Sequence, residues 1–324
     1  MISRTDNDSI LPLQGPLLCI VGPTAIGKNR AASILSKSLA VEIVNADSRQ
    51  VYKEVLIGTG SPRRSNINTP QHHLYNFIPP ELNYNLQSFT NDARGVINTI
   101  QQKKKLPVLV GGTGQYIWAL LENWQIPEVA PDEDFRSHYL NRVEKEGPQG
   151  IHAELQKIDQ ISSSRIHMNN VRRVIRALEV YHATGTPFSS LVRKSKLGNK
   201  VLIIGMNAIT TVIQANIERR IESMFKDGWL DEVKNLFSKY PDLSLSFYSS
   251  IGYLEIIDYL AGNISFEETL TKIQKKTVSF AKKQYNWFSL HDSRIHWTSE
   301  LPFTSLGTSW DLVNSYFPQY KINH

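Results

Sequence analysis

Gly22-Pro23-Thr24-Ala25-Ile26-Gly27-Lys28 is the most informative motif in this 324-residue sequence. Its glycines and lysine have the spacing of a Walker A loop, G-x-x-x-x-G-K, whose backbone N–H groups close on phosphate oxygens while the lysine supplies a positive charge. The apolar run Leu17–Val21 precedes the motif, and Asn29 to Leu39 follows with apolar residues close to helical spacing. The start of that helix adds a partial positive charge. The sequence therefore predicts a strand, a phosphate-binding loop and a helix in succession.

The position after the loop lysine departs from the motif. It ordinarily carries Ser or Thr, whose hydroxyl binds Mg²⁺, whereas this chain has Asn29. An amide oxygen can bind Mg²⁺ directly or through water, although it reaches farther and points differently. Asn29 is accordingly a candidate metal ligand, and Mg²⁺ is the expected cofactor.

Two more strand-like runs end in polar or glycine-rich segments. Val41–Val44 leads to Asn45-Ala46-Asp47, and Leu106–Val110, which follows a helical pattern from Phe89 to Lys105, leads to Gly111-Gly112-Thr113-Gly114. Strand–helix alternation predicts a P-loop NTPase-like α/β fold, a parallel sheet flanked by helices. Ligands bind beyond the carboxyl ends of such strands, so the three loops should converge on one site.

Asp47 and Thr113 are the candidate site residues in these loops. Asp47 is the only carboxylate directly after the second strand, and it can hold Mg²⁺ through water, act as a base, or cap the next helix. Thr113 can cap a helix over Gln115–Asn123, contact a substrate, or do both. His72-His73 are adjacent, so their rings diverge and a metal site there is not expected.

The domain organisation follows from the patterns along the rest of the chain. Residues 126–199 show helical patterns and no convincing strand, which predicts a helical insertion domain. Residues 13–125 and 200–297 would form the catalytic core, in which Val201–Met206 returns to strand and Val212 to Leu290 supplies a helical pair or triplet. Residues 1–12 are polar and are expected to be a disordered leader.

Charge and composition narrow the class of partner. Lys plus Arg number 36 against 30 for Asp plus Glu, a net charge of +6 that favours anionic ligands such as diphosphates or RNA. The single cysteine, Cys19, excludes an intramolecular disulfide and a Cys-based zinc finger. No apolar run approaches the roughly 18 residues of a membrane helix, and the polar residues 1–12 are not expected to act as a secretory signal. We expect a cytoplasmic monomer without membrane contact.

Basic clusters could form an RNA-binding surface. They are Arg172-Arg173-Arg176, Arg219-Arg220, Lys275-Lys276 and Lys282-Lys283, the last of which is followed by the aromatic residues Tyr285, Trp287 and Phe288. Interleaved cations and aromatic rings suit RNA. Most charge runs are only solvated faces, and the i,i+3 pair Arg176 and Glu179 is a candidate internal ion pair.

With these residues in view, the chain resembles the tRNA dimethylallyltransferases, also called tRNA isopentenyltransferases. The resemblance runs in the family's order from about residue 17 to 297. Its matching stretches are Gly22–Ala25 with Gly27-Lys28, Asn45–Tyr52, Ile57–Thr59, His72–Leu74, Leu109–Ile117, Arg173–Tyr181 with Thr184-Gly185, Ile251–Tyr253, Ala281–Gln284 and Trp287-Phe288. Together these stretches are far more specific than the Walker-like loop alone.

The resemblance implies an activity. A dimethylallyl group would pass from dimethylallyl diphosphate to the exocyclic N6 amine of the adenine 3′ of the anticodon, position 37, in tRNAs reading codons that start with U. Asp47 would be the general base, and Lys28, Thr113 and Arg220 would neutralise diphosphate oxygens. The loop Gly22–Asn29 would hold the diphosphate. The tRNA, through its anticodon stem-loop, would contact Asp47, Ser48, Arg49, Gln50, Thr113, Arg136, Arg172, Arg173, Arg176, Lys282, Lys283 and Gln284.

The chain also departs from the family pattern, which leaves other functions open. Ile26 replaces a usual Ser, Asn170 replaces Asp, and Val278-Ser279 replace Arg-Gln. The alternatives are an adenylate isopentenyltransferase, which needs no anticodon surface, a P-loop small-molecule kinase, which Asn29 disfavours, and a catalytically weakened tRNA-binding homologue.

Overall fold

The computed structural model describes residues 13, 15–62, 70–195, 200–299 and 308–322. These residues fall into two compact units, one within Leu13–Leu121 and Leu197–His324 and the other within Glu122–Lys196. We call them the α/β unit and the helical unit. Residues 1–12, for which a disordered leader was predicted, lie outside the described residues.

A six-stranded sheet organises the α/β unit, with strand order β3-β2-β4-β1-β5-β6. The strands are β1 (Leu17–Val21), β2 (Val41–Asn45), β3 (His72–His73), β4 (Leu106–Val110), β5 (Val201–Met206) and β6 (Ile295–Thr298). All five pairings are parallel. The predicted α/β class with a parallel sheet is therefore confirmed. β1, β2 and β4 are buried along their full length, as expected for strands covered on both faces.

The sheet order places the phosphate loop at a switch point. From β1 the chain moves toward one edge to reach β2, returns to β4 beside β1, and later forms β5 on the other side of β1. Crossovers between parallel strands are almost always right-handed, and those from β1 to β2 and from β3 to β4 run in opposite directions along the sheet. This rule assigns α1 (Lys28–Leu35) and α2 (Leu86–Gln102) to opposite faces. In open sheets of this kind the ligand binds where the direction reverses, which here is the loop after β1.

Helix ends follow local signals that periodicity alone does not reveal. α2 begins at Leu86, ahead of the predicted Phe89, because the Asn85 side chain accepts a hydrogen bond from the Ser88 N–H and caps the helix. α1 ends at Leu35, short of the predicted Leu39, and Leu39 instead bridges to Lys321. α3 spans Gly114–Leu121.

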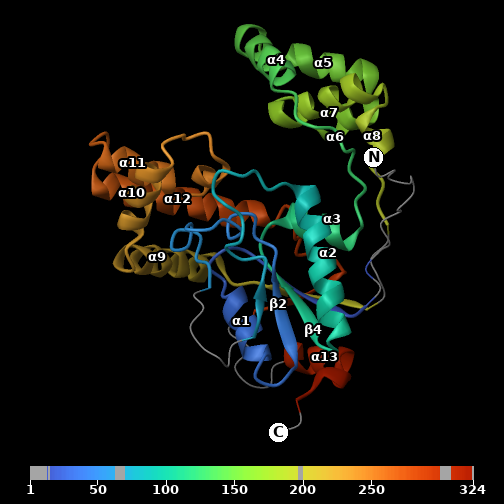
Figure 1. Ribbon diagram of the computed structural model, residues 1–324, viewed down its shortest axis with the longest axis vertical. Coiled ribbons are helices and arrows are strands. Elements are labelled where there is room, and N and C mark those ends of the chain that lie inside the picture. Colours follow the sequence, from blue (N-terminus) through green and yellow to red (C-terminus); the bar gives the residue numbers. More distant parts are fainter. Residues whose placement is uncertain (1–12, 14, 63–69, 196–199, 300–307, 323–324) are drawn as a thin grey trace, which may run out of the picture. The chain divides into compact units, whose positions relative to one another are not determined.

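The C-terminal part of the α/β unit contains more helices than predicted. α9 (Thr210–Lys226), α10 (Trp229–Lys239), α11 (Tyr253–Leu260) and α12 (Phe266–Gln284) contact one another, with the 3₁₀ helix η1 (Ser246–Ser249) between α10 and α11. Figure 1 shows these four helices gathered in one group. The prediction of a helical pair or triplet was wrong because short turns split the apolar pattern. α13 (Thr308–Tyr316) and η2 (Pro318–Tyr320) follow β6.

The helical unit has a small core of its own. Its helices are α4 (Glu133–Glu146), α5 (Gln149–Ile158), α6 (Gln160–Arg165), α7 (Val171–Thr184) and α8 (Phe188–Leu191). Tyr139, Leu155, Val174 and Leu178 are buried together between them. Among the described residues of this unit, no extended strand is present and one isolated bridge joins Gln125 to Arg193.

Candidate active site

The phosphate loop has the backbone shape that its sequence requires. Gly22 has a φ of +141°, and a Cβ there would lie 2.5 Å from the Met206 carbonyl oxygen, so only glycine fits. Ala25, at φ +62°, also lies in the left-handed region, which is uncommon for a residue with a side chain. The Lys28 ammonium group folds back over the loop and donates to the carbonyl oxygens of Gly22 at 3.0 Å and Pro23 at 2.8 Å.

A cavity of about 210 Å³ opens beside this loop. Its walls combine residues from distant parts of the chain: Thr24, Ala25, Gly27, Lys28, Asn29, Arg30, Asp47, Gln50, Gly60, Gly111, Arg220 and Gln284. Three cationic side chains and one carboxylate face it, so the cavity suits an anion. The structure thus brings Asp47 and Arg220 to the phosphate loop, as predicted for Asp47 from the strand ends and as implied for Arg220 by the family resemblance.

Burial controls the electrostatics of the two central cations. Desolvation lowers the pKa of Lys28 to about 8, with Asp47 opposing the shift and Arg220 adding to it. Desolvation also lowers the pKa of Arg220, again against the attraction of Asp47. Both groups are therefore less well solvated than free side chains. A bound anion would stabilise their charged forms.

Asp47 is held by its neighbours on the chain. The Asn45 side chain accepts from the Asp47 N–H at 2.9 Å and donates to the Asp47 carbonyl oxygen at 3.0 Å. One carboxylate oxygen of Asp47 accepts from the Arg49 N–H at 2.9 Å, which closes an Asx turn. The carboxylate therefore caps a turn at the strand end. Of the roles that the sequence left open for Asp47, capping of the next helix is excluded.

Thr113 links two strand ends. Its hydroxyl oxygen accepts from the Ser48 N–H at 3.0 Å, while its backbone carbonyl accepts from the N–H groups of Tyr116 and Ile117 in the first turn of α3. The side chain thus does not cap α3. Thr113 is not among the residues that line the 210 Å³ cavity, although it contacts the segment that carries Asp47.

Gln284, Arg49 and Gln50 were predicted to contact tRNA, and their side chains bind backbone atoms in this structure. The Gln284 amide accepts from the Thr24 N–H at 2.7 Å and donates to the Gly112 carbonyl at 2.9 Å. Arg49 donates to the Ser246 carbonyl at 2.7 Å, and Gln50 donates to the Thr59 carbonyl at 2.9 Å. These hydrogen bonds to distant backbone groups could not be predicted from the sequence, because the partners lie up to 260 positions apart.

The predicted cationic residues of the helical unit fall into two groups. Arg136 and Arg176 both pair with the buried carboxylate of Glu179, which confirms the Arg176–Glu179 ion pair anticipated from the sequence. Arg172 and Arg173 lie exposed in the first turn of α7. In the α/β unit, Lys282 and Lys283 are exposed in the last turn of α12.

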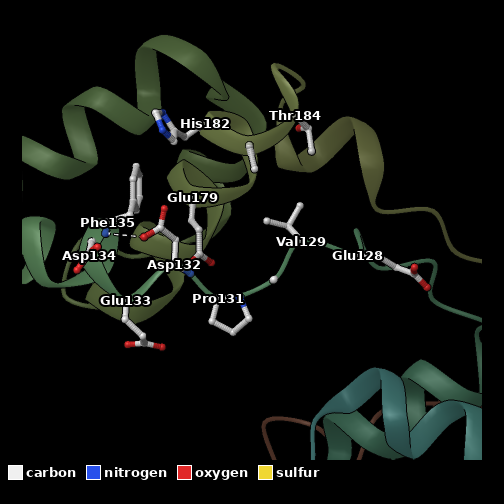
Figure 2. A pocket seen from close by; sticks show the side chains of 12 residues that line it. Glu128, Val129, Pro131, Asp132, Glu133, Asp134, Phe135, Glu179, His182 and Thr184 are labelled. Carbon is white, nitrogen blue, oxygen red and sulfur yellow. Dashed lines mark hydrogen bonds between the residues drawn. The ribbon is translucent and has the colours of Figure 1, made fainter.

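The helical unit also contains a cavity of about 680 Å³ (Figure 2). Figure 2 shows the Asp132 side chain between those of Phe135 and Glu179. Glu128, Glu133 and Asp134 also line the cavity. Its carboxylates would repel phosphate groups, so the smaller cavity at the phosphate loop is the better candidate for an anionic substrate.

Two negative findings apply to the described ranges given above. They contain no group of three or more His, Cys, Asp or Glu residues placed to hold a metal ion. None of their helices combines the length and apolar character needed to cross a bilayer.

Sequence comparisons identify related proteins. A profile described as IPP transferase matches residues 50–291, and one described as isopentenyl transferase matches residues 16–75. The chain is 38% identical over 286 residues to a tRNA dimethylallyltransferase of Dehalococcoides mccartyi, covering 88% of both chains. It is 40% identical over 273 residues to one of Roseiflexus castenholzii, covering 84% of this chain and 89% of that protein.

Solved structures show the same relationship. The full-length tRNA isopentenylpyrophosphate transferase from Bacillus halodurans aligns with a TM-score of 0.65 at 32% identity, over 93% of this chain and 94% of that one. A eukaryotic dimethylallyltransferase acting on tRNA aligns with a TM-score of 0.77 over 96% of this chain and 81% of that one. At 22% identity the second likeness supports the fold alone.

Proposed function

The chain belongs to the IPP transferase family, and we propose that it is a tRNA dimethylallyltransferase. It would transfer the dimethylallyl group of dimethylallyl diphosphate to the N6 amine of adenine 37, next to the anticodon, in tRNAs that read codons starting with U. The observation that carries this proposal is the cavity where Lys28 and Arg220 face the Asp47 carboxylate. An anionic leaving group and a proton acceptor are what this transfer requires.

The cations serve the leaving group. During transfer the bond between the allylic carbon and the bridging oxygen breaks, and the diphosphate gains the electron pair of that bond. Lys28 and Arg220, both partly desolvated, stabilise this developing charge more strongly than water would. The backbone amides of the loop Gly22–Asn29 and the partial positive charge at the start of α1 act in the same direction.

Asp47 serves the nucleophile. An aromatic amine is weakly nucleophilic, and it must lose a proton as its nitrogen forms the new bond to carbon. The carboxylate of Asp47 is fixed by Asn45 and by the Asx turn, so it meets the amine already oriented. It accepts the amine proton as the C–N bond forms.

Magnesium fits the oxygen atoms available here. Mg²⁺ commonly binds through one or two protein oxygens together with substrate phosphates and waters, and Asn29 and Asp47 both line the cavity. When bound, the ion would neutralise charge on the diphosphate. Asn29 would hold it by its amide oxygen and Asp47 through a water.

Transfer RNA would be bound by exposed cations. Arg172 and Arg173 on α7 and Lys282 and Lys283 on α12 present charges that phosphates can reach. Arg136 and Arg176 already share Glu179, so they have less capacity for phosphate. The target adenine must leave its stack to reach the cavity, as in other enzymes that modify a nucleobase.

The test is mass analysis of tRNA nucleosides after incubation of the protein with tRNA and dimethylallyl diphosphate. We expect dimethylallyl adenosine only in tRNAs with adenine 3′ of an anticodon that reads U-starting codons. A matched anticodon stem-loop with guanine at that position is the control. Prenylation of free AMP would instead indicate an adenylate isopentenyltransferase, and phosphoryl transfer from ATP to a small alcohol would indicate a kinase. Binding of tRNA without transfer would indicate a catalytically weakened homologue.

A further inference from the structure

Glu232 lies on α10, and its carboxylate binds an unusual set of donors. Three consecutive backbone amides donate to it, those of Leu56 at 2.9 Å, Ile57 at 2.7 Å and Gly58 at 3.1 Å. The Tyr253 hydroxyl adds a fourth hydrogen bond at 2.7 Å. Glu232 does not line the cavity at the phosphate loop.

The other end of the same loop reaches the cavity. The Thr59 carbonyl accepts from the Arg220 guanidinium at 3.0 Å and from the Gln50 amide at 2.9 Å. Arg220 and Gln50 both line the cavity. A loop of five residues, 56–60, therefore contacts the Glu232 carboxylate through its first three amides and two cavity side chains, Arg220 and Gln50, through the Thr59 carbonyl.

The loop has little room to move. A Cβ on Gly58 would lie 2.2 Å from the Trp229 indole nitrogen, and one on Gly60 would lie 2.4 Å from a guanidinium nitrogen of Arg220. Gly60 also has a φ of +63°, which favours glycine. Because the loop is in contact with Trp229 and with Arg220, a shift of its amides at Glu232 would also displace the Thr59 carbonyl.

We propose that Glu232 is a positioning residue of the diphosphate site, which sets the guanidinium of Arg220 through the loop 56–60. This inference rests on the proposed function for its substrate. Hydrogen bonds to a charged acceptor are stronger than neutral ones, so the carboxylate holds all three amides at once. An amide in its place has a single acceptor oxygen, and its NH₂ group would face backbone N–H donors.

The test uses inorganic diphosphate and tRNA as separate probes of the full-length protein. For Glu232→Gln we expect about a tenfold weaker affinity for diphosphate and an unchanged affinity for tRNA. In an Arg220→Ala background the same substitution should change diphosphate affinity less than about twofold, because the group it positions is gone. Glu54→Gln is the matched control, since Glu54 forms an exposed ion pair with Lys239, which is also on α10. The Glu54→Gln protein should bind diphosphate with wild-type affinity.

Several outcomes would overturn the proposal. They are an unchanged diphosphate affinity in Glu232→Gln, an equal loss for diphosphate and tRNA, and the same loss with and without Arg220. If Glu232→Gln does not fold, Gly60→Ala displaces the Arg220 end of the loop and leaves the Glu232 carboxylate intact. Wild-type diphosphate affinity in Gly60→Ala would then contradict the proposal. Neither titration needs prenyl transfer, so a failure of the proposed function shows separately, as a lack of product from the wild-type protein.

Discussion

Asp47 shares one cavity with Lys28 and Arg220, so the carboxylate proposed as the general base also interacts with the two cations. We expect Asp47→Asn to lose turnover by a factor on the order of 10²–10⁴, the usual range for loss of a general base. Binding of tRNA should be preserved, because an amide oxygen can still accept from the Arg49 N–H. Single-turnover transfer measured near pH 6.5, below the Lys28 pKa of about 8, keeps Lys28 charged in the wild-type protein. A near-normal rate would remove Asp47 from the mechanism.

The lowered pKa of Lys28, about 8, predicts a pH dependence of diphosphate binding. The protonated lysine attracts the anion, so affinity should be full below pH 8 and should fall as pH rises through that value. A bound diphosphate stabilises the ammonium form and moves the midpoint upward. Calorimetric titration from pH 6.5 to 9.5 measures this, with Lys28→Arg as the control that keeps its charge. A wild-type curve as flat as that of Lys28→Arg would show that Lys28 does not titrate in this range.

Asn29 is the residue at which the loop departs from its motif, and Asn29→Thr restores the usual hydroxyl. Mg²⁺ prefers hard oxygen ligands at roughly 2.1 Å, so we expect Mg²⁺-dependent diphosphate binding to strengthen by less than about tenfold, roughly 1.4 kcal/mol. Affinity should stay unchanged if Asp47 holds the ion through water. Titrating Mg²⁺ at fixed diphosphate distinguishes these results. A large loss of affinity would mean that the amide makes a necessary contact of its own.

At the scale of the element, β2 carries a buried carboxylate near its amino end. Burial by itself would raise the pKa of Glu42, but hydrogen bonds from Lys105, His73 and Lys103 outweigh it and hold the pKa at about 2. The carboxylate is 1% exposed, and the two lysines are 42–43% exposed. Since the folded pKa lies below the unfolded value of 4.5, this contribution to stability is present above pH 4.5 and is lost as pH falls toward 2.

Glu42→Gln should therefore lower the free energy of unfolding by roughly 1–3 kcal/mol at pH 7, the range for loss of a charged hydrogen-bond partner. The difference from wild type should shrink at pH 3. Urea unfolding at the two pH values measures it. Diphosphate affinity is the control and should not change, because Glu42 does not line the cavity. An equal difference at both pH values would contradict the charge-based explanation.

The same scale shows what sequence patterns could predict. β1, β4 and β5 have the bounds expected from continuous apolar runs, since strands buried on both faces carry that signal by themselves. β3 and β6 were missed because two and four residues at the sheet edges have no periodicity, and their pairing depends on distant partners. Likewise the phosphate loop could be found from local spacing. The hydrogen bonds made by Glu232 and Gln284 could not be predicted in this way, because each side chain binds backbone groups more than 170 positions away.

For the whole molecule, the net charge of +6 says less about RNA binding than the surroundings of the individual cations do. Arg136 and Arg176 contribute two of the positive charges, but they bind Glu179 and are only 32% and 29% exposed. Arg172 and Lys282 are exposed, and neither of them pairs with Glu179. Counting clusters in a sequence treats these four residues alike, whereas their surroundings predict different effects on RNA binding.

The salt dependence of tRNA binding tests that difference. Each phosphate contact releases counterions, so losing one reduces the slope of log affinity against log salt by about 0.7–0.9. We expect Arg172→Ala combined with Lys282→Ala to weaken tRNA binding and reduce the slope by up to twice that amount, with diphosphate affinity unchanged. Arg176→Ala is the matched control: it breaks an ion pair with a buried carboxylate, so it should lower thermal stability and change the slope less. If the double variant keeps the wild-type slope, Arg172 and Lys282 do not contact phosphates, and the attraction for tRNA must come from other cations.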